Sequence, residues 1–246
     1  MRRRAIPDAL WQHTLGRYPF LRSASGDDAA LLRRLATLFL DRKEFSGAQG
    51  LAVTDTMAVA VAAQACLPVL RLGLHLYDGF VGIVMHRDEV VAQREITDEA
   101  GVVHRYGELL SGEAMDGGPM MLSWRDVAGA GASAERGYNV VIHEFVHVID
   151  LIDGAADGVP PQPDRASRVH WLRTIESEFA GFRRRIDAGN ETALDPYGTE
   201  SLDEFFAVAA EAFFVSPAAM RAEHAALYEL FAGYFRQDPA REGAGS

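Results

Sequence analysis

The sequence has a single cysteine, no apolar run long enough to cross a bilayer and no excess of positive charge. Cys66 has no partner for an intramolecular disulfide, which is typical of proteins in a reducing cytoplasm. The longest apolar run, MAVAVAAQACLPVL, has about 14 residues and contains a proline, whereas a transmembrane helix needs about 20. The net charge of −11 repels phosphates, which argues against direct binding to nucleic acid.

The start of the chain, MRRR, is not followed by an apolar segment, so the sequence predicts no secretory signal. We therefore expect a cytoplasmic protein that does not bind membranes. With 246 residues, 48% of them hydrophobic, the chain is long enough for one sizeable core or for a main domain with a smaller partner.

The hydrophobic pattern predicts helices first, then short strands, then helices again, an order typical of the α+β class. Residues 1–26, FSGAQG (45–50) and DVAGAGASAERG (126–137) are expected to be irregular. The predicted strands, at 80–86, 89–95, 101–107 and 120–124, would form a small, mainly antiparallel sheet. The predicted helices begin at Asp27 and cover 56–66, 140–152, 165–186, 202–214 and 218–235.

The stretch NVVIHEFVHVID (139–150) carries two histidines and a glutamate in an otherwise apolar helix. His143 and His147 are four residues apart, so both imidazoles lie on one helix face at a spacing that suits two positions on Zn²⁺. Glu144 is rotated by about 100° from His143 and is placed to act on a water beside the metal. The H-E-x-x-H pattern therefore indicates a zinc hydrolase.

The alternative is that both histidines are ordinary core residues, since this five-residue pattern also arises by chance. A buried glutamate and two imidazoles among valines and phenylalanines would then leave several polar atoms to satisfy, each costing about 1–3 kcal/mol if unpaired. A metal removes that cost, so we favour the metal site over the metal-free helix.

The third ligand is less clear from spacing. Asp150 and Asp153 stand where some zinc proteases have a glycine and a ligand, and the glycine that those sites need is absent. Glu204 and Glu211 are the two polar residues in an apolar helical stretch, seven positions apart on one face. Either could be a ligand, both could face solvent, and Glu204 could instead complete a capping box with Ser201.

The chain resembles a known family in the stretches that carry these residues. GYNVVIHEFVHVIDLIDG, followed by YGTESLDEFFAVAAEAFF, is similar to the Mlc titration factor A family of bacterial zinc peptidases. FLDRKEFSG, AAQACLPVLRLGL and SGEAMDGGPMMLSW extend the resemblance through most of the chain. The spacing Tyr-x6-Glu-Phe-Phe-Ala also resembles the catalytic domain of anthrax lethal factor.

The resemblance implies a gluzincin with one Zn²⁺ per chain, held by His143, His147 and Glu204. It implies Glu144 as the general base of an aminopeptidase-like reaction on peptides, by a metal-activated water. It also implies that the Tyr197 hydroxyl points at the site, whereas on the residues alone Tyr197 is a loop-packing tyrosine. The implied fold is a zincin-like domain (69–246) with an N-terminal helical portion (1–68) packed on it, and one compact unit is the alternative.

Three further residues have open roles. Asp150 could accept a hydrogen bond from a ligand histidine or cap the helix end, and Glu211 could play a similar supporting role. MMLSW could be an edge strand that pairs with a peptide substrate. Glu113 could hold a peptide N-terminus, although an ordinary solvated glutamate is the favoured interpretation.

The family resemblance also implies a protein partner, a transcriptional repressor of glucose-uptake genes that the protein would titrate away from DNA. The alternative to an enzyme is therefore a non-enzymatic or weakly enzymatic protein that sequesters this regulator. A metal-free helical scaffold is a third hypothesis.

Overall fold

The computed structural model describes residues 5–22, 26–88, 90–97, 103–110, 112–113 and 118–242. The helices are α1 (Asp8–Arg17), α2 (Asp27–Arg42), α3 (Asp55–Ala65), α4 (Trp124–Ser133), α5 (Val140–Asp150), α6 (Arg165–Asp187), α7 (Leu202–Val215), α8 (Pro217–Glu223), α9 (Ala225–Phe235) and α10 (Pro239–Glu242). The strands are β1 (Glu44–Gly47), β2 (Gly82–His86), β3 (Val90–Thr97), β4 (Val103–Leu110), β5 (Gly112–Glu113) and β6 (Met120–Ser123). This combination confirms the predicted α+β class.

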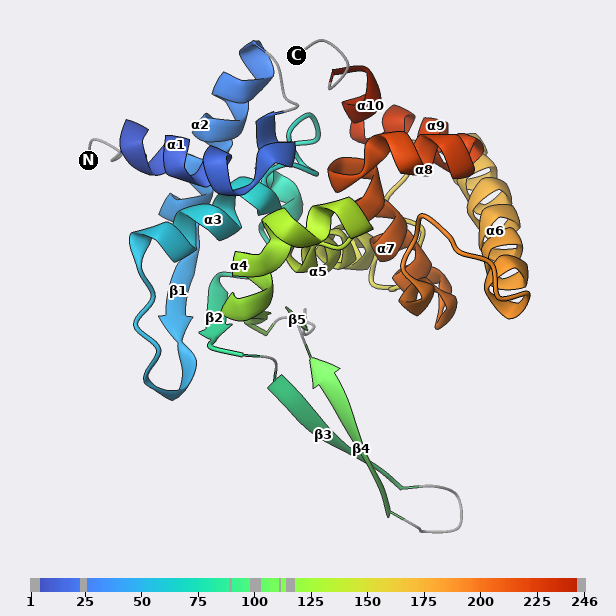
Figure 1. Ribbon diagram of the computed structural model, residues 1–246, viewed down its shortest axis with the longest axis horizontal. Helices are drawn as coiled ribbons and strands as arrows, with labels where there is room; N and C mark the ends of the chain where they lie inside the picture. Colours follow the sequence, from blue (N-terminus) through green and yellow to red (C-terminus); the bar gives the residue numbers. More distant parts are fainter. Residues whose placement is uncertain are drawn as a thin grey trace.

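The sheet beside the helices has the strand order β1-β2-β6-β5. β1, β2 and β6 run parallel, and β5 pairs with β6 in the antiparallel direction. β3 and β4 form a separate antiparallel hairpin that extends away from the helical body (Figure 1). The expectation of a mainly antiparallel sheet is therefore not confirmed, because α3 makes the crossover that lets β1 and β2 run side by side in one direction.

Four segments differ from the sequence-based expectation. Residues 45–47, expected to be irregular, form most of strand β1. Residues 8–17 form α1 instead of an irregular start, and Trp11 anchors this helix in the core. The glycine-rich stretch expected to be a loop forms most of α4, where Gly131 lets the Arg17 carbonyl come so close that a Cβ would lie 2.1 Å from its oxygen. The last predicted helix is divided at His224, whose φ of −124° and ψ of 54° are not helical.

One hydrophobic core runs through the molecule, with α5 and α7 at its centre. The Phe145 ring on α5 lies 5.6 Å from the Phe39 ring of α2 and 4.9 Å from the Tyr77 ring. The N-terminal helices therefore support the helix that carries the two histidines. The division of the chain at residue 68 stays a prediction.

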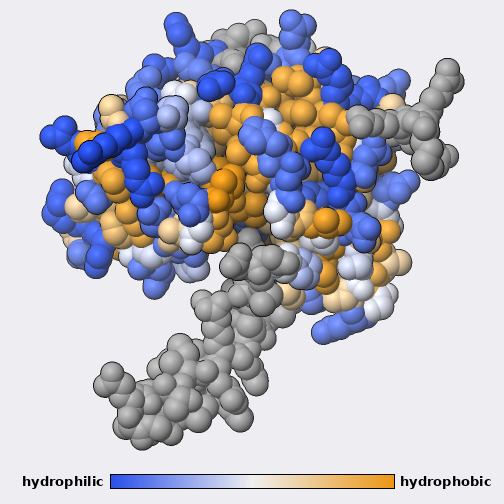
Figure 2. All heavy atoms as spheres, turned by 180° about the vertical axis from the view of Figure 1, so that it is seen from behind, coloured by the Kyte–Doolittle hydropathy of each residue, from blue (hydrophilic) through white to orange (hydrophobic). Residues whose placement is uncertain are grey.

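The surface is mixed in character. On the back face, hydrophobic residues gather along the middle and hydrophilic residues lie on both sides of them (Figure 2). Within the described ranges, no helix combines the length and the apolar character that crossing a membrane requires.

Candidate metal centre

Helix α5 begins where the sequence predicts, because the Asn139 side chain caps it. Asn139 Oδ1 accepts a hydrogen bond from the Ile142 amide at 3.0 Å. The helix is buried on nearly all sides, and the His143 and Glu144 side chains lie inside with it, 8% and 5% exposed. Polar groups held this deeply need partners, and the neighbouring helix α7 supplies them for His143.

Helix α7 begins at its own cap, where the Glu204 amide donates to Ser201 Oγ at 3.4 Å. The carboxylate of Glu204 does not complete the capping box. It points instead at α5, with Oε2 lying 3.1 Å from His143 Nε2 and 3.5 Å from His147 Nε2. Of the two glutamates on this helix, Glu204 is therefore the one that joins the histidines.

His143, His147 and Glu204 form a cluster whose three ligand atoms all lie within 4.8 Å of one another. The two imidazole Nε2 atoms approach to 3.2 Å. Glu204 Oε2 is buried, and despite its closeness to both rings it makes no well-directed hydrogen bond within the described residues. Three lone-pair atoms that converge in this way fit a metal ion, and two imidazoles with one carboxylate are a donor set that zinc accepts.

Glu211 lies on the far side of His143 from the cluster. Its Oε1 is 2.8 Å from His143 Nδ1, and its Oε2 accepts a hydrogen bond from the Asn139 amide. With Nδ1–H donating to Glu211, the other ring nitrogen is free to turn its lone pair toward Glu204 and His147. Asn139 in turn donates to Gln64 of α3 at 2.8 Å, a support that sequence reasoning missed.

The charges of the cluster are strongly coupled. Burial opposes a charge on His143, yet its contacts with Glu204 and Glu211 raise the pKa of this imidazole well above its ordinary value. Burial likewise opposes ionisation of Glu204, but the two imidazoles hold its pKa far below the usual range. A cation at the shared point would take the place of a proton on His143 Nε2.

Glu144 is not part of the cluster, although it follows His143 directly. Burial raises the pKa of its carboxyl above the ordinary value, and the nearby imidazoles of His143 and His147 oppose this shift. A carboxyl group with a raised pKa next to a metal centre is suited to taking up and releasing a proton.

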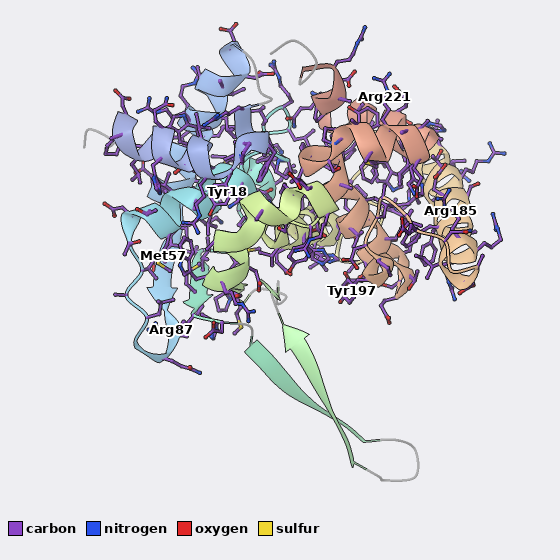
Figure 3. The ribbon with its side chains drawn as sticks, in the orientation of Figure 1. Tyr18, Met57, Arg87, Arg185, Tyr197 and Arg221 are labelled. Carbon is purple, nitrogen blue, oxygen red and sulfur yellow. The ribbon has the colours of Figure 1, made fainter. Side chains whose placement is uncertain are left out.

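Tyr197 lies next to the cluster on the short 3₁₀ turn η6 (Pro196–Thr199), at the lower edge of the helical body beside α7 (Figure 3). Its ring centre is 6.2 Å from that of His143, and the residue is 50% exposed. The next residue, Gly198, packs so closely on α7 that a Cβ would lie 3.4 Å from the Phe205 Cα. This contact holds the turn, and Tyr197 with it, against the helix that carries Glu204.

The remaining sequence-predicted residues have other positions. Asp150 Oδ2 accepts a hydrogen bond from the Gly158 amide at 2.8 Å, so Asp150 caps the loop after α5. In the described part of the chain, no hydrogen bond joins Asp150 to His143 or His147. β6 is not an open edge, since it lies between β2 and β5. The side chain of Glu113 lies outside the described residues.

Replacing Glu211 by glutamine is expected to weaken metal binding by roughly 10- to 100-fold. Glutamine cannot accept from both His143 Nδ1 and the Asn139 amide, because one of its two ends carries hydrogens. A competition titration of the protein against a chromophoric chelator measures the change. Glu178→Gln is the matched control, since Glu178 makes a similar contact of 2.9 Å with His224, which is not in the cluster. Equal affinities for the two variants would contradict the role of Glu211.

Comparison with known proteins agrees with this geometry. The family model described as glucose-regulated metallo-peptidase M90 matches residues 1–236. Two proteins named Mlc titration factor A are similar to this chain. The one from Enterobacter sp. is 33% identical over 97% of this chain and 92% of its own length. The one from Pectobacterium atrosepticum is 34% identical over 93% and 86%.

An uncharacterized protein of Synechocystis sp. is similarly related, being 32% identical over 93% of this chain and 84% of its own length. These matches extend over nearly the whole chain and include the cluster and both helices that carry it. The resemblance noted in the sequence is therefore confirmed. The chain belongs to the glucose-regulated metallo-peptidase M90 family.

Proposed function

We propose that this protein is a cytoplasmic, zinc-dependent peptidase with an aminopeptidase-like activity. His143, His147 and Glu204 hold the ion, Glu144 is the general base, and Tyr197 assists from the rim. The proposal rests on one observation. The ligand atoms of His143, His147 and Glu204 lie within 4.8 Å of one another, and Glu144, which is not one of these ligands, is buried beside them. The first test is zinc content, followed by loss of peptide hydrolysis on chelation and its return on adding zinc.

Zinc bound in such a site supplies a Lewis acid that polarises a carbonyl group and lowers the pKa of water to about 7. Glu144 accepts a proton from the attacking water on a carboxylate oxygen. Burial raises the pKa of Glu144, which favours its protonated form, and the protonated carboxyl can deliver this proton to the nitrogen of the leaving amine. Three protein ligands leave a position open for the reacting groups.

Tyr197 contributes a hydroxyl group at the exposed side of the site. A substrate carbonyl that is attacked by water develops negative charge on its oxygen, and a phenol O–H that donates to this oxygen lowers the barrier. The 50% exposure of Tyr197 suits a residue that meets the substrate.

A second function is favoured by the name of the relatives, Mlc titration factor A. The protein would bind a transcriptional repressor of glucose-uptake genes and withdraw it from DNA, with weak hydrolysis or none. One molecule can have both functions, and the Glu144→Gln variant separates them.

Replacing Tyr197 by phenylalanine is expected to lower kcat for peptide hydrolysis by roughly 10²- to 10³-fold, the range for one lost donor to a developing oxyanion. Zinc content should not change, because Tyr197 is not a member of the ligand cluster. Tyr228→Phe is the control, since the Tyr228 hydroxyl donates to Asp238. An unchanged kcat in Tyr197→Phe would remove this residue from the mechanism.

A further inference from the structure

A second hollow, separate from the metal centre, has a volume of about 620 Å³. It lies between the 3₁₀ turn η3 (Leu74–Tyr77), the segment 161–163, α6 and α9, and none of its lining residues belongs to the metal cluster. The volume falls in the range of about 300–1,000 Å³ that is typical of ligand sites. Its apolar walls are formed by Leu72, Leu76, Pro161, Pro163, Trp171 and Leu230.

The charges at this hollow are unequal. Arg236 lines it from the end of α9, is exposed, and makes no ion pair with any residue that the structure describes. The one acidic residue of the lining, Glu229, lies 3.5 Å from Arg221. The imidazoles of His75 and His170 add two further groups that are able to donate hydrogen bonds. Because Glu229 is already paired, the Arg236 guanidinium is the charged group of this lining that lacks an ion-pair partner among the described residues.

The backbone at Arg236 is unusual. Its φ of 55° and ψ of 41° lie in the left-handed region, where a glycine would be accommodated without cost at the end of a helix. An arginine in this conformation costs of order 1 kcal/mol or more, so the end of α9 departs here from the local preference of the chain.

We propose that this hollow binds the C-terminal carboxylate of a peptide that ends in an apolar residue. The Arg236 guanidinium would pair with the carboxylate through two parallel hydrogen bonds. The terminal side chain would pack on Trp171 and the leucines, and the polar groups of Gln162 and Ser167 would meet the peptide backbone. A fatty acid has the same carboxylate but no backbone amides, so it cannot make these contacts with Gln162 and Ser167.

The hollow is joined to the metal-binding helix by two hydrogen bonds. Trp171 Nε1 donates to the Gly158 carbonyl at 2.8 Å, and the Gly158 amide donates to Asp150 Oδ2 at the end of α5. A protein tail seated in the hollow would thus be held at a fixed place relative to α5. The inference concerns binding alone and does not depend on the proposed hydrolysis.

Isothermal titration calorimetry of the zinc-loaded full-length protein tests the inference. The probe is an N-acetylated hexapeptide ending in leucine, once with a free carboxylate and once as the carboxamide. A Glu144→Gln background prevents hydrolysis of the probe. We expect the carboxylate form to bind roughly 10- to 100-fold more tightly, and Arg236→Gln to reduce its affinity to that of the amide. Arg241→Gln, on the exposed end of α10, is the charge-matched control.

A second variant blocks the hollow without removing a charge. A Cβ at Gly233, which lines the hollow, meets no atom within 4 Å, so Gly233→Leu should fold and fill the space. It is expected to abolish binding, whereas Gly129→Leu, at an equally open position on α4, should not. Equal binding of acid and amide, an affinity of Arg236→Gln for the acid equal to that of the unaltered protein, or binding of decanoate more tightly than of the peptide would each overturn the proposal.

Discussion

Replacing Glu144 by glutamine is expected to lower kcat for peptide hydrolysis by roughly 10²- to 10⁴-fold while zinc stays bound. Glutamine keeps the shape of the side chain but cannot accept the proton of the attacking water. Zinc is retained because Glu144 is not one of the converging ligands, and its neighbours His143 and His147 keep their places on α5.

Two measurements on the same sample check this expectation, zinc content by mass spectrometry and hydrolysis of a fluorogenic peptide. Glu176→Gln, on the exposed face of α6, is the matched control for the loss of one carboxylate. Normal hydrolysis by the Glu144 variant would show that the general base has been assigned wrongly. Loss of zinc together with activity would show that Glu144 holds the metal site together and does not act as a base.

The same variant separates the two functions. If repression of glucose-uptake genes is relieved in cells by Glu144→Gln as well as by the unaltered protein, the regulatory effect needs binding alone. If Glu144→Gln loses the relief of repression together with hydrolysis, the regulatory effect depends on cleavage. The Tyr197→Phe variant should follow the same pattern, because both changes leave the ligand cluster intact.

The helices that carry the site could be predicted because their signals are local. Asn139 and Ser201 each cap a helix with their own side chain, and the apolar residues that follow fix the length of the helix. The sheet could not be predicted in the same way. Strand β1 takes its last three residues from FSGAQG, which has the composition of a turn, and its parallel pairing with β2 makes this segment a strand. Helix α4 was missed because its glycines are typical of a loop, whereas Gly131 serves close packing against the end of α1, which a sequence pattern does not show.

The sequence alone predicts that His143 and His147 lie close together, because residues four apart on a helix share a face. It could not choose between Glu204 and Glu211, which share a face of α7 as well. The structure separates them by the edge of the His143 ring that each one meets: Glu204 lies at Nε2 and Glu211 at Nδ1. The contribution of Gln64 could not be foreseen, since it comes from a helix 75 residues before Asn139 in sequence.

This separation leads to the second large expected effect. Replacing Glu204 by alanine removes one of three ligand atoms, so zinc affinity should fall by more than the roughly 10- to 100-fold expected for Glu211→Gln, and hydrolysis should be lost at zinc concentrations that saturate the unaltered protein. The chelator competition described above measures both variants on one scale. Asp203→Asn, which changes the neighbouring carboxylate on α7, is the control and should bind zinc normally.

The decisive result is which variant, Glu204→Ala or Glu211→Gln, weakens zinc binding more. This order depends on the edge of the His143 ring that each glutamate meets. A direct ligand is part of every state in which the metal is bound, whereas a group behind His143 only orients the ring and sets which nitrogen carries the proton. If Glu211→Gln weakens zinc binding more than Glu204→Ala does, the two glutamates have exchanged roles and the α7 carboxylate nearest to Asn139 is the ligand. If Glu204→Ala binds zinc as tightly as Asp203→Asn, the convergence of Glu204 on the two imidazoles reflects a buried ion pair without a metal.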